Sequence, residues 1–450
     1  MLLEAIRSSY WFVPTVMAFA AMLLGAGMVW VDVRVEAGWL DEIGWYQAAK
    51  PSGAREVLST VAGSMITVAG VVFSITIVAL SYASSQYGPR VLTNFMSDRG
   101  NTVTLGTFIA TFVYCLVVLR TIRGGDEGSF VPQLAVLLGI ALALCSIGVL
   151  IYFIHHVLQS IHINHVVASI GRQLIEGVDE RFPDYIGQPI ADARQVRPPG
   201  DLPPGQETRS VSATAYGYIQ SIDGDTLLKA AEKGGVVLRL RYRPGDFVTK
   251  GRPLADASPA ERVDEEVCEE VRGAFVVGVK RTPFGDLHFL IDELVEVGAR
   301  ALSSGVNDPL TAATCMDWLG AAIEQIATRK LPDPARTAAD GDVRVIALPD
   351  GFGIFLGQSF GQLRGYAARD PLAALHFLKT LGEIAARCVD ADQLRLIDLE
   401  RSRLVELAER SLGGESLEAV RRRSDALAAL FKLGCGRIGE RRVDWLGGGA

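Results

Sequence analysis

Residues 57–89 read VLSTVAGSMITVAGVVFSITIVALSYASSQYGP, a run of 33 positions without Asp, Glu, Lys or Arg. A helix needs ~20 apolar residues to cross the ~30 Å hydrocarbon core of a bilayer. This stretch therefore predicts a membrane-spanning helix, which we place near residues 60–83.

Three further charge-free runs, of 24, 20 and 44 residues, lie between the start of the chain and Arg172. They predict additional spans near residues 11–31, 103–119 and 131–154. Four of the six tryptophans flank the first span, as is typical of side chains at a membrane interface. The first run is too long for a removed signal peptide and lacks a small-residue cleavage site.

Charge is unevenly spread along the 450 residues, whose formal net charge is −7. Residues 1–160 carry 8 Lys/Arg and 9 Asp/Glu, and residues 161–450 carry the other 36 and 42. We therefore expect a membrane domain over 1–160, in contact with lipid, followed by a soluble and mildly acidic part. The negative balance gives no reason to expect nucleic acid as a partner.

Four spans place both termini on the same side of the membrane. The Lys/Arg flanking the spans divide four against five between the two sides, so they give no positive-inside signal. The six cysteines stand singly, without a C-x-x-C pair, which suits a reducing compartment. We therefore predict a bacterial inner-membrane protein with cytoplasmic N- and C-termini.

Small and hydroxyl-bearing residues recur at helical spacing on one stripe of the second span: Gly63, Thr67, Gly70, Ser74, Ser81 and Ser85. Such a stripe is typical of tight helix packing, and it is also compatible with the wall of a pore or cavity. A shorter stripe on the fourth span, formed by Gly139, Ala143 and Ser146, favours packing.

Four of the six histidines follow the fourth span within eleven residues: His155, His156, His162 and His165. We interpret His155 and His156 as interfacial or pH-sensing side chains. Because no carboxylate or cysteine stands nearby to complete a coordination sphere, we expect neither a metal site nor a cofactor.

The soluble part divides at six prolines between residues 183 and 204. We assign 161–207 to a helical stalk and linker, and 208–285 to a small β-barrel-like subdomain. The turn at 243–254 supports the barrel because it is similar to the G-D-x-V-x-K-G turn of lipoyl-like domains. The sequence 258–261 reads as a capping box that opens a helix to about residue 272.

Residues 286–450 have a mainly helical pattern, interrupted by expected short strands over 343–356. The predicted fold is therefore an α-helical membrane domain with four transmembrane helices plus an α+β soluble domain.

Catalytic motifs are scarce. Gly357–Gly361 fits the G-x-S-x-G pattern, after an expected strand over 354–356. A nucleophile elbow also needs a broad parallel sheet and downstream acid and histidine partners, whereas here only Asp370 and His376 follow, in an apparent helix. The recurrence of glycine every four residues fits a packed helix better. We do not expect an enzyme.

The densest polar cluster is RALSSGVNDPLTA, residues 300–312. It predicts a helix end followed by a new helix with Asp308 as N-cap and Pro309 in the first turn. A structural corner is the simpler interpretation, while free amides beside charged side chains would suit a ligand or subunit contact. The candidate residues are Arg300, Ser303, Asn307, Asp308 and Thr311. On the preceding helix, His288 and Asp292 lie one turn apart, as expected of solvated or salt-linked side chains.

Several longer motifs resemble a widespread bacterial family of predicted membrane proteins of unknown function. They are GVVFSITIVALS at 70–81 with SSQYGPR at 84–90, FIHH at 153–156, GYIQSID at 217–223, RPG at 243–245, and RALSSGVNDP at 300–309. This sequence has Ser304 and Val306 where the family usually has Pro and Ile. The resemblance implies four spans and a soluble C-terminal domain, and it supplies no activity.

Two functions remain open. The first is a homo-oligomeric channel or transport-like protein, in which Thr67, Gly70, Ser74, Ser81 and Ser85 line a path. The second is a membrane-anchored sensor or scaffold, whose soluble domain binds a small ligand or a protein near Asn307 and Asp308.

Overall fold

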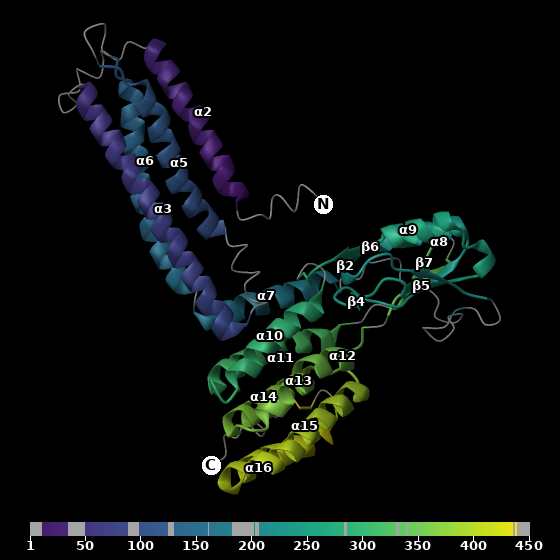
Figure 1. The fold of residues 1–450 in the computed structure, drawn as a ribbon. Coiled ribbons are helices and arrows are strands. Elements are labelled where there is room, and N and C mark those ends of the chain that lie inside the picture. The colour runs from purple at the N-terminus through teal and green to yellow at the C-terminus, as the bar shows by residue number, and fades with distance from the viewer. Residues whose placement is uncertain are drawn as a thin grey trace. The chain divides into compact units, whose positions relative to one another are not determined.

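The computed structural model describes residues 11–34, 50–88, 99–124, 130–160, 162–181, 202, 207–282, 286–329, 333–338, 341–348, 350–434 and 437–438. The chain forms two compact units, Met1–Val166 and Val167–Ala450 (Figure 1). We call them the membrane unit and the soluble unit.

The membrane unit contains four long apolar helices: α2 (Phe12–Arg34), α3 (Pro51–Tyr87), α5 (Arg99–Thr121) and α6 (Gln133–Ser160). Each is long and apolar enough to cross a bilayer. The four predicted stretches are confirmed as apolar helices long enough to span a membrane, and α3 begins nine residues earlier than the span we placed there.

Helix α5 packs against the other three helices, and large side chains fill the space between them. Phe108, Tyr114 and Phe153 are each less than 2% exposed. The Tyr114 hydroxyl donates to the carbonyl oxygen of Ala135 at 2.9 Å, so its polar atom is satisfied inside the helical unit.

Polar groups near one end of the helices join them to one another. The Asp32 carboxylate, in the last turn of α2, accepts hydrogen bonds from the backbone N–H groups of Leu134 at 2.9 Å and Ala135 at 2.8 Å. An acidic side chain stabilises a helix N-terminus because those N–H groups lack intrahelical partners. Arg55 of α3 donates to the carbonyl oxygen of Ile122 at 2.8 Å.

Helix α7 (Ile163–Arg181) follows α6 after a break and packs within the soluble unit. A Cβ atom on Gly171 would lie 2.3 Å from the Trp318 ring, and one on Gly177 would lie 2.7 Å from Leu287. Helix α6 ends at Ser160, and α7, which lies in the stretch assigned to a helical stalk, packs closely against Trp318 and Leu287. The proline-rich linker lies mostly outside the described residues.

The strands of the soluble unit form two sheets. The strands are β1 (Arg209–Ser212), β2 (Gly217–Ile222), β3 (Val237–Leu240), β4 (Phe247–Val248), β5 (Pro253–Ser258), β6 (Phe275–Gly278), β7 (Ala335–Thr337) and β8 (Val343–Ile346). One sheet has the order β1-β5-β3-β8-β7 and the other β4-β2-β6. Strand β3 pairs in parallel with β8, Leu238 opposite Val345. A closed barrel is not formed by the described strands.

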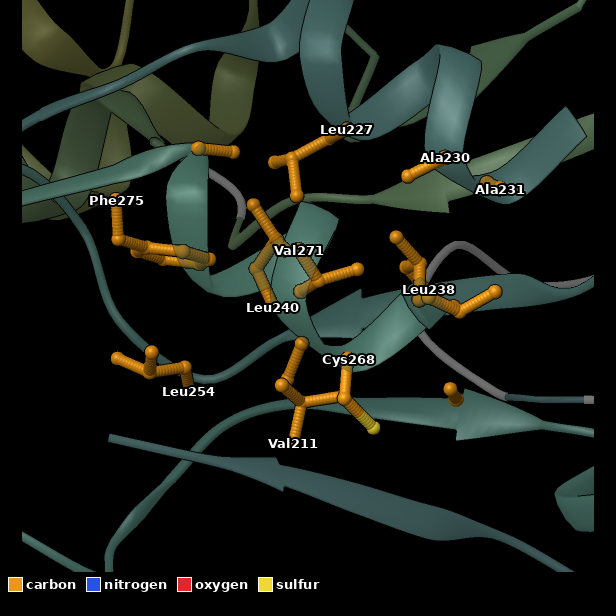
Figure 2. Close-up of a cluster of buried hydrophobic side chains, with 14 of the residues drawn as sticks. Val211, Leu227, Ala230, Ala231, Leu238, Leu240, Leu254, Cys268, Val271 and Phe275 are labelled. Atoms are coloured by element: carbon orange, nitrogen blue, oxygen red, sulfur yellow. The ribbon is translucent and has the colours of Figure 1, made fainter. Parts of the chain in front are cut away.

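Helices α8 (Gly224–Gly234) and α9 (Glu265–Gly273) cover the strands and enclose an apolar core. Figure 2 shows Leu227 of α8 and Val271 of α9 directed toward Leu238 and Leu240 of β3. The capping box expected at 258–261 is incorrect: Ser258 is buried in β5, and α9 is capped instead by Asp264, whose carboxylate accepts from Val267 N.

The helical part comprises α10 (Leu287–Ala301), α11 (Pro309–Thr328), α12 (Phe352–Leu356), the π-helical turn η4 (Gly357–Gly361), α13 (Gln362–Ala367), α14 (Pro371–Arg387), α15 (Ala391–Ser411) and α16 (Gly414–Phe431). Asp side chains cap α10, α11, α14 and α15. The strand expected at 354–356 is a helix, because Phe352, Phe355 and Leu356 bury at helical spacing.

Candidate functional site

The small-residue stripe of α3 lies on the outer surface of the membrane unit. Thr67, Gly70, Ser74, Ser81 and Ser85 are exposed. The hydroxyl groups of Thr67 and Ser74 donate to backbone carbonyls one turn earlier, at 2.8 and 2.9 Å. Intrachain packing uses another face of α3, which carries Ala54, Leu58, Ala62, Met65, Ala69, Val72, Thr76, Ala79 and Ala83.

The shorter stripe on α6 does pack inside the membrane unit. A Cβ on Gly139 would lie 3.0 Å from Leu58, and the Ser146 hydroxyl lies 3.1 Å from that of Thr111. The packing interpretation is confirmed for Gly139 and Ser146.

The 300–312 corner is built as the helix restart that its sequence predicts. The Asp308 carboxylate accepts from Thr311 N at 3.1 Å and from the Thr311 hydroxyl at 2.5 Å. Ser303 donates to the carbonyl oxygen of Arg300 at 2.6 Å, and Asn307 adopts a positive φ of 52° between the helices. Because Asp308 already binds the Thr311 amide, that amide is not available to an external anion.

His155 and His156, which we expected to be interfacial or pH-sensing side chains, lie near the end of α6. A ring nitrogen of His155 lies 2.9 Å from the Gln159 amide nitrogen, and the His156 ring stacks on Tyr152 with centroids 5.4 Å apart. Among the described residues, no group of three His, Cys, Asp or Glu is arranged to hold a metal ion.

The G-x-S-x-G motif is part of a helix. Ser359 is fully buried and donates to the carbonyl oxygen of Phe355 at 2.7 Å, so its hydroxyl is not presented to a substrate. The motif contains η4, and π-helical turns inserted in α-helices occur often at functional sites. The neighbouring Gln358 side chain enters a polar cavity.

This cavity, which we call the junction cavity, lies where the turn after β3 meets α10 and η4. Its volume is about 380 Å³. It is lined by Arg243, Pro244, Gly245, Asp246, Arg281, His288, Asp292, Ile354, Gln358 and Gln362. Polar and charged side chains from distant parts of the sequence therefore meet at one opening.

One side of the junction cavity is an ion-pair cluster. Arg281 Nη1 lies 2.6 Å from Asp292, and Nη2 lies 2.9 Å from Asp286, which is 2% exposed. Burial opposes the charge on Arg281, but the two carboxylates outweigh burial and raise the pKa of the guanidinium. Asp286 also caps α10 by accepting from Phe289 N at 3.0 Å. The ion pairs and this capping hydrogen bond thereby fix the positions of Arg281, Asp286 and Asp292.

The other side of the cavity centres on His288. Gln358 donates through Nε2 to Asp292 at 2.7 Å and to the carbonyl oxygen of His288 at 3.0 Å. Its Oε1 atom therefore faces His288 Nδ1 as an acceptor, so Nδ1 carries a proton. His288 Nε2 lies 3.5 Å from Asp350, which also pairs with Arg243 at 3.3 Å.

These contacts control the protonation of His288. Burial opposes the imidazolium, but the bonds to Asp350 and Gln358 outweigh burial and raise the pKa of His288 above its ordinary value. The ring also stacks on Phe355, with centroids 4.9 Å apart, which fixes its orientation. A continuous chain of polar contacts thus runs from Arg243 through Asp350, His288, Gln358 and Asp292 to Arg281.

The turn that closes the junction cavity requires glycine at position 245. Gly245 has a φ of 96°, and a Cβ there would lie 2.4 Å from Asp286 and 3.0 Å from Arg281. The turn after β3 therefore approaches the start of α10 closely at this backbone position.

A second cavity of about 300 Å³ lies on the other side of Arg243 and Pro244. Its wall is largely aliphatic, with Leu228, Leu240 and Val345 among its residues. The turn after β3 thus lies between two openings, and the second has more aliphatic side chains in its wall.

The comparisons with known proteins agree with this architecture. The model of the family described as "Predicted membrane protein (DUF2254)" matches residues 7–383. The chain belongs to this family. That match covers all four membrane helices and most of the soluble unit, including every residue of the junction cavity.

Relatives in the family carry no assigned activity in their names. The chain is 31% identical over 428 residues to the "Uncharacterized protein Rv1290c" of Mycobacterium tuberculosis and to the "Uncharacterized protein Mb1321c" of Mycobacterium bovis. Each match covers 93% of this chain and 80% of the relative. No solved structure matches.

Sequence reasoning identified two parts of the junction cavity without joining them. It singled out the Arg243-Pro-Gly turn as a motif, and it expected His288 and Asp292 to be solvated or salt-linked. In the structure Asp292 pairs with Arg281 and His288 lies 3.5 Å from Asp350, which agrees with the second alternative. Sequence reasoning did not identify Arg281, Asp350 or Gln358 as site residues. The useful signal was a glycine after proline in a turn, which marks close approach of the backbone to another element.

Proposed function

We propose that the protein is a membrane-anchored receptor whose soluble unit binds a small polar molecule in the junction cavity. The observation that supports this proposal is the chain of polar contacts from Arg243 to Arg281 around an opening of about 380 Å³. Ligand sites are typically concave, preformed and few per protein, with polar groups that fix the ligand's orientation.

The wall offers both donors and acceptors, because Arg243, Arg281 and Gln358 stand beside Asp292. A ligand that carries both kinds of group, such as an amino acid, a hydroxy acid or an amide, matches that wall. Every charged side chain named here is already held by a partner, which favours binding over chemistry. We therefore propose a binding role and not a catalytic one.

The test is thermal unfolding of the full-length protein in lipid discs, with a panel of amino acids, hydroxy acids and amides. A ligand that binds the folded state raises the unfolding temperature. Gln362→Trp places a bulky group in the cavity from an exposed position, and Leu372→Trp on α14 is the matched control. We expect at least one compound to stabilise the wild type and the control but not Gln362→Trp.

Two outcomes of this experiment would contradict the proposed binding role. If no compound in the panel stabilises the wild type, or if stabilisation survives in Gln362→Trp, the junction cavity is not the receptor site.

A homo-oligomeric channel is the second candidate, and the outward stripe of α3 favours it. The interior of the membrane unit is filled by Phe108, Tyr114 and Phe153, so a path would have to form between copies of the chain. Exposed Thr67, Gly70, Ser74, Ser81 and Ser85 would then line it.

Cysteine accessibility distinguishes a water path from a lipid-facing surface. In a background that lacks Cys145 and Cys435, Ser74→Cys and Ser81→Cys should react with a small aqueous thiol reagent. Ile147→Cys, on the exposed face of α6, should not react. Equal protection of all three positions would eliminate the channel.

We also propose that the chain lies in the bacterial inner membrane with both termini in the cytoplasm. A reporter active only in the cytoplasm should function when fused after Ala450 and fail when inserted within 35–50. The reverse pattern would invert the topology.

A further inference from the structure

The sheet formed by β4, β2 and β6 (labelled in Figure 1) has exposed apolar side chains at one end of its strands. Tyr216 precedes β2, Phe247 lies in β4 and Val279 follows β6; they are 68%, 53% and 95% exposed. Tyr218 of β2 pairs with Phe247 in the ladder, and their rings meet edge to face with centroids 5.1 Å apart. We call Tyr216, Tyr218, Phe247 and Val279 the end patch. The ring contact joins Tyr218 to Phe247, and Tyr216 and Val279 lie at the same end of the strands. Exposed apolar side chains gathered in this way are one mark of a contact site.

Three cations surround the end patch. Lys250 and Arg252 lie in the turn between β4 and β5, and Lys280 follows Val279; all three are exposed. The N–H of Gly251 donates to the carbonyl oxygen of Ala213 at 2.8 Å, and the N–H of Ala213 donates to the carbonyl oxygen of Arg252 at 2.9 Å. These hydrogen bonds hold the turn beside the segment that leads to Tyr216. None of the three cations forms an ion pair with any part of the chain that the structure describes.

This local positive charge is opposite to that of the chain as a whole, whose net charge is −7. Such a reversal favours an anionic partner. Exposed tyrosines beside lysine and arginine are the composition that proteins use at the headgroup layer of a membrane.

The covalent connection between the two units also favours a lipid bilayer as the partner. Four helices long and apolar enough to cross a bilayer precede the soluble unit in the same chain. Tethering converts a weak contact into an intramolecular one with a high effective concentration. A lipid surface can therefore bind the end patch through fewer contacts than a freely diffusing protein would need.

We propose that the end patch contacts the surface of an anionic lipid bilayer. Tyr216, Phe247 and Val279 enter the headgroup layer, while Lys250, Arg252 and Lys280 bind lipid phosphates. The soluble unit is thereby held against the membrane by a second attachment besides its covalent connection.

The experiment places an environment-sensitive NBD fluorophore at Val279→Cys in full-length protein lacking Cys145 and Cys435. The protein is reconstituted in phosphatidylcholine vesicles with or without phosphatidylglycerol, and with brominated lipids as contact quenchers. Leu372→Cys on α14, also exposed, is the matched control site. We expect quenching at position 279 in anionic vesicles and none at position 372.

Charge and salt then test the mechanism. The double variant Lys250→Glu and Lys280→Glu should lose the quenching, and so should the wild-type patch in about 1 M salt, where the Debye length falls to ~3 Å. Tyr216→Ser, which leaves the charges intact, should weaken it. An unchanged unfolding temperature in each variant shows that the soluble unit remains folded.

Three results would overturn the proposal. The first is absence of quenching by brominated lipids in anionic vesicles. The second is quenching that persists after charge reversal and in high salt. The third is energy transfer between labelled copies without lipid quenching, which would assign the end patch to a second copy of the chain.

Discussion

Gly245→Ala tests the close contact between the turn after β3 and the N-cap of α10. An alanine at a φ of 96° is strained by about 1–2 kcal/mol. Its Cβ would also lie 2.4 Å from Asp286, so the carboxylate must move from its place as the cap of α10 and partner of Arg281. Loss of a cap costs about 1 kcal/mol, and disturbing a buried ion pair adds to it. We expect a total of about 3 kcal/mol.

Gly251→Ala is the matched control for this prediction. Gly251 has a similar φ of 85°, but a Cβ there meets nothing within 4 Å. It should therefore lose only the strain, about 1–2 kcal/mol. The difference between the two variants isolates the steric contact of residue 245 with Asp286 and Arg281.

Thermal unfolding of full-length protein in lipid discs measures both variants, with hydrogen exchange of the α10 amides as a local readout. At about 2–4 °C per kcal/mol, Gly245→Ala should lower the unfolding temperature by roughly 6–12 °C and Gly251→Ala by about 2–8 °C. Faster exchange in the first turn of α10 should appear only in Gly245→Ala. Equal losses, or unchanged exchange in Gly245→Ala, would refute the close contact.

Three further predictions concern other polar contacts. Asp308→Ala should lower the stability of the soluble unit by about 1 kcal/mol in thermal unfolding, because Thr311 N loses its cap, whereas Asp308→Asn should retain most of it. Asp32→Ala should destabilise the membrane unit, because the first N–H groups of α6 lose their acceptor; in a titration with denaturing detergent, α6 should separate from its neighbours at a lower detergent concentration. Asp32→Asn should have a smaller effect. The raised pKa of His288 stabilises the folded state fully below about pH 6.5, and this contribution should disappear as pH rises through the folded-state value; His288→Gln should remove that part of the pH dependence of unfolding.

Local signals in the sequence were sufficient to locate the helices that are marked by a long apolar run or by a capping residue. Charge-free runs located all four membrane helices, and the sequence Asp308-Pro309 marked the start of α11 to the residue. Such features depend on neighbouring residues alone. The orientation of α3 was harder to read, because alanine, glycine and serine are all small, and only packing distinguishes the alanine face turned inward from the stripe turned outward.

The junction cavity could not be assembled from the sequence because its parts are distant along the chain. Arg243, His288 and Gln358 come from a turn, a helix and a π-helical turn, and no spacing rule connects them. The strand expected at 354–356 shows the same limit: a short apolar run fits strand and buried helix alike, and only its burial against other helices decides.

The parallel pairing of β3 with β8 has a consequence for the order of folding. Leu238 meets Val345 only after more than a hundred intervening residues, which include all of α10 and α11. Contacts of such sequence separation form slowly, since a long loop must close before the pairing stabilises it. During synthesis, β3 therefore has an unpaired edge until β8 leaves the ribosome, whereas the α10–α11 hairpin can form from local contacts. The five-stranded sheet, although it begins earlier in the chain, is therefore completed only after α10 and α11 have been synthesised.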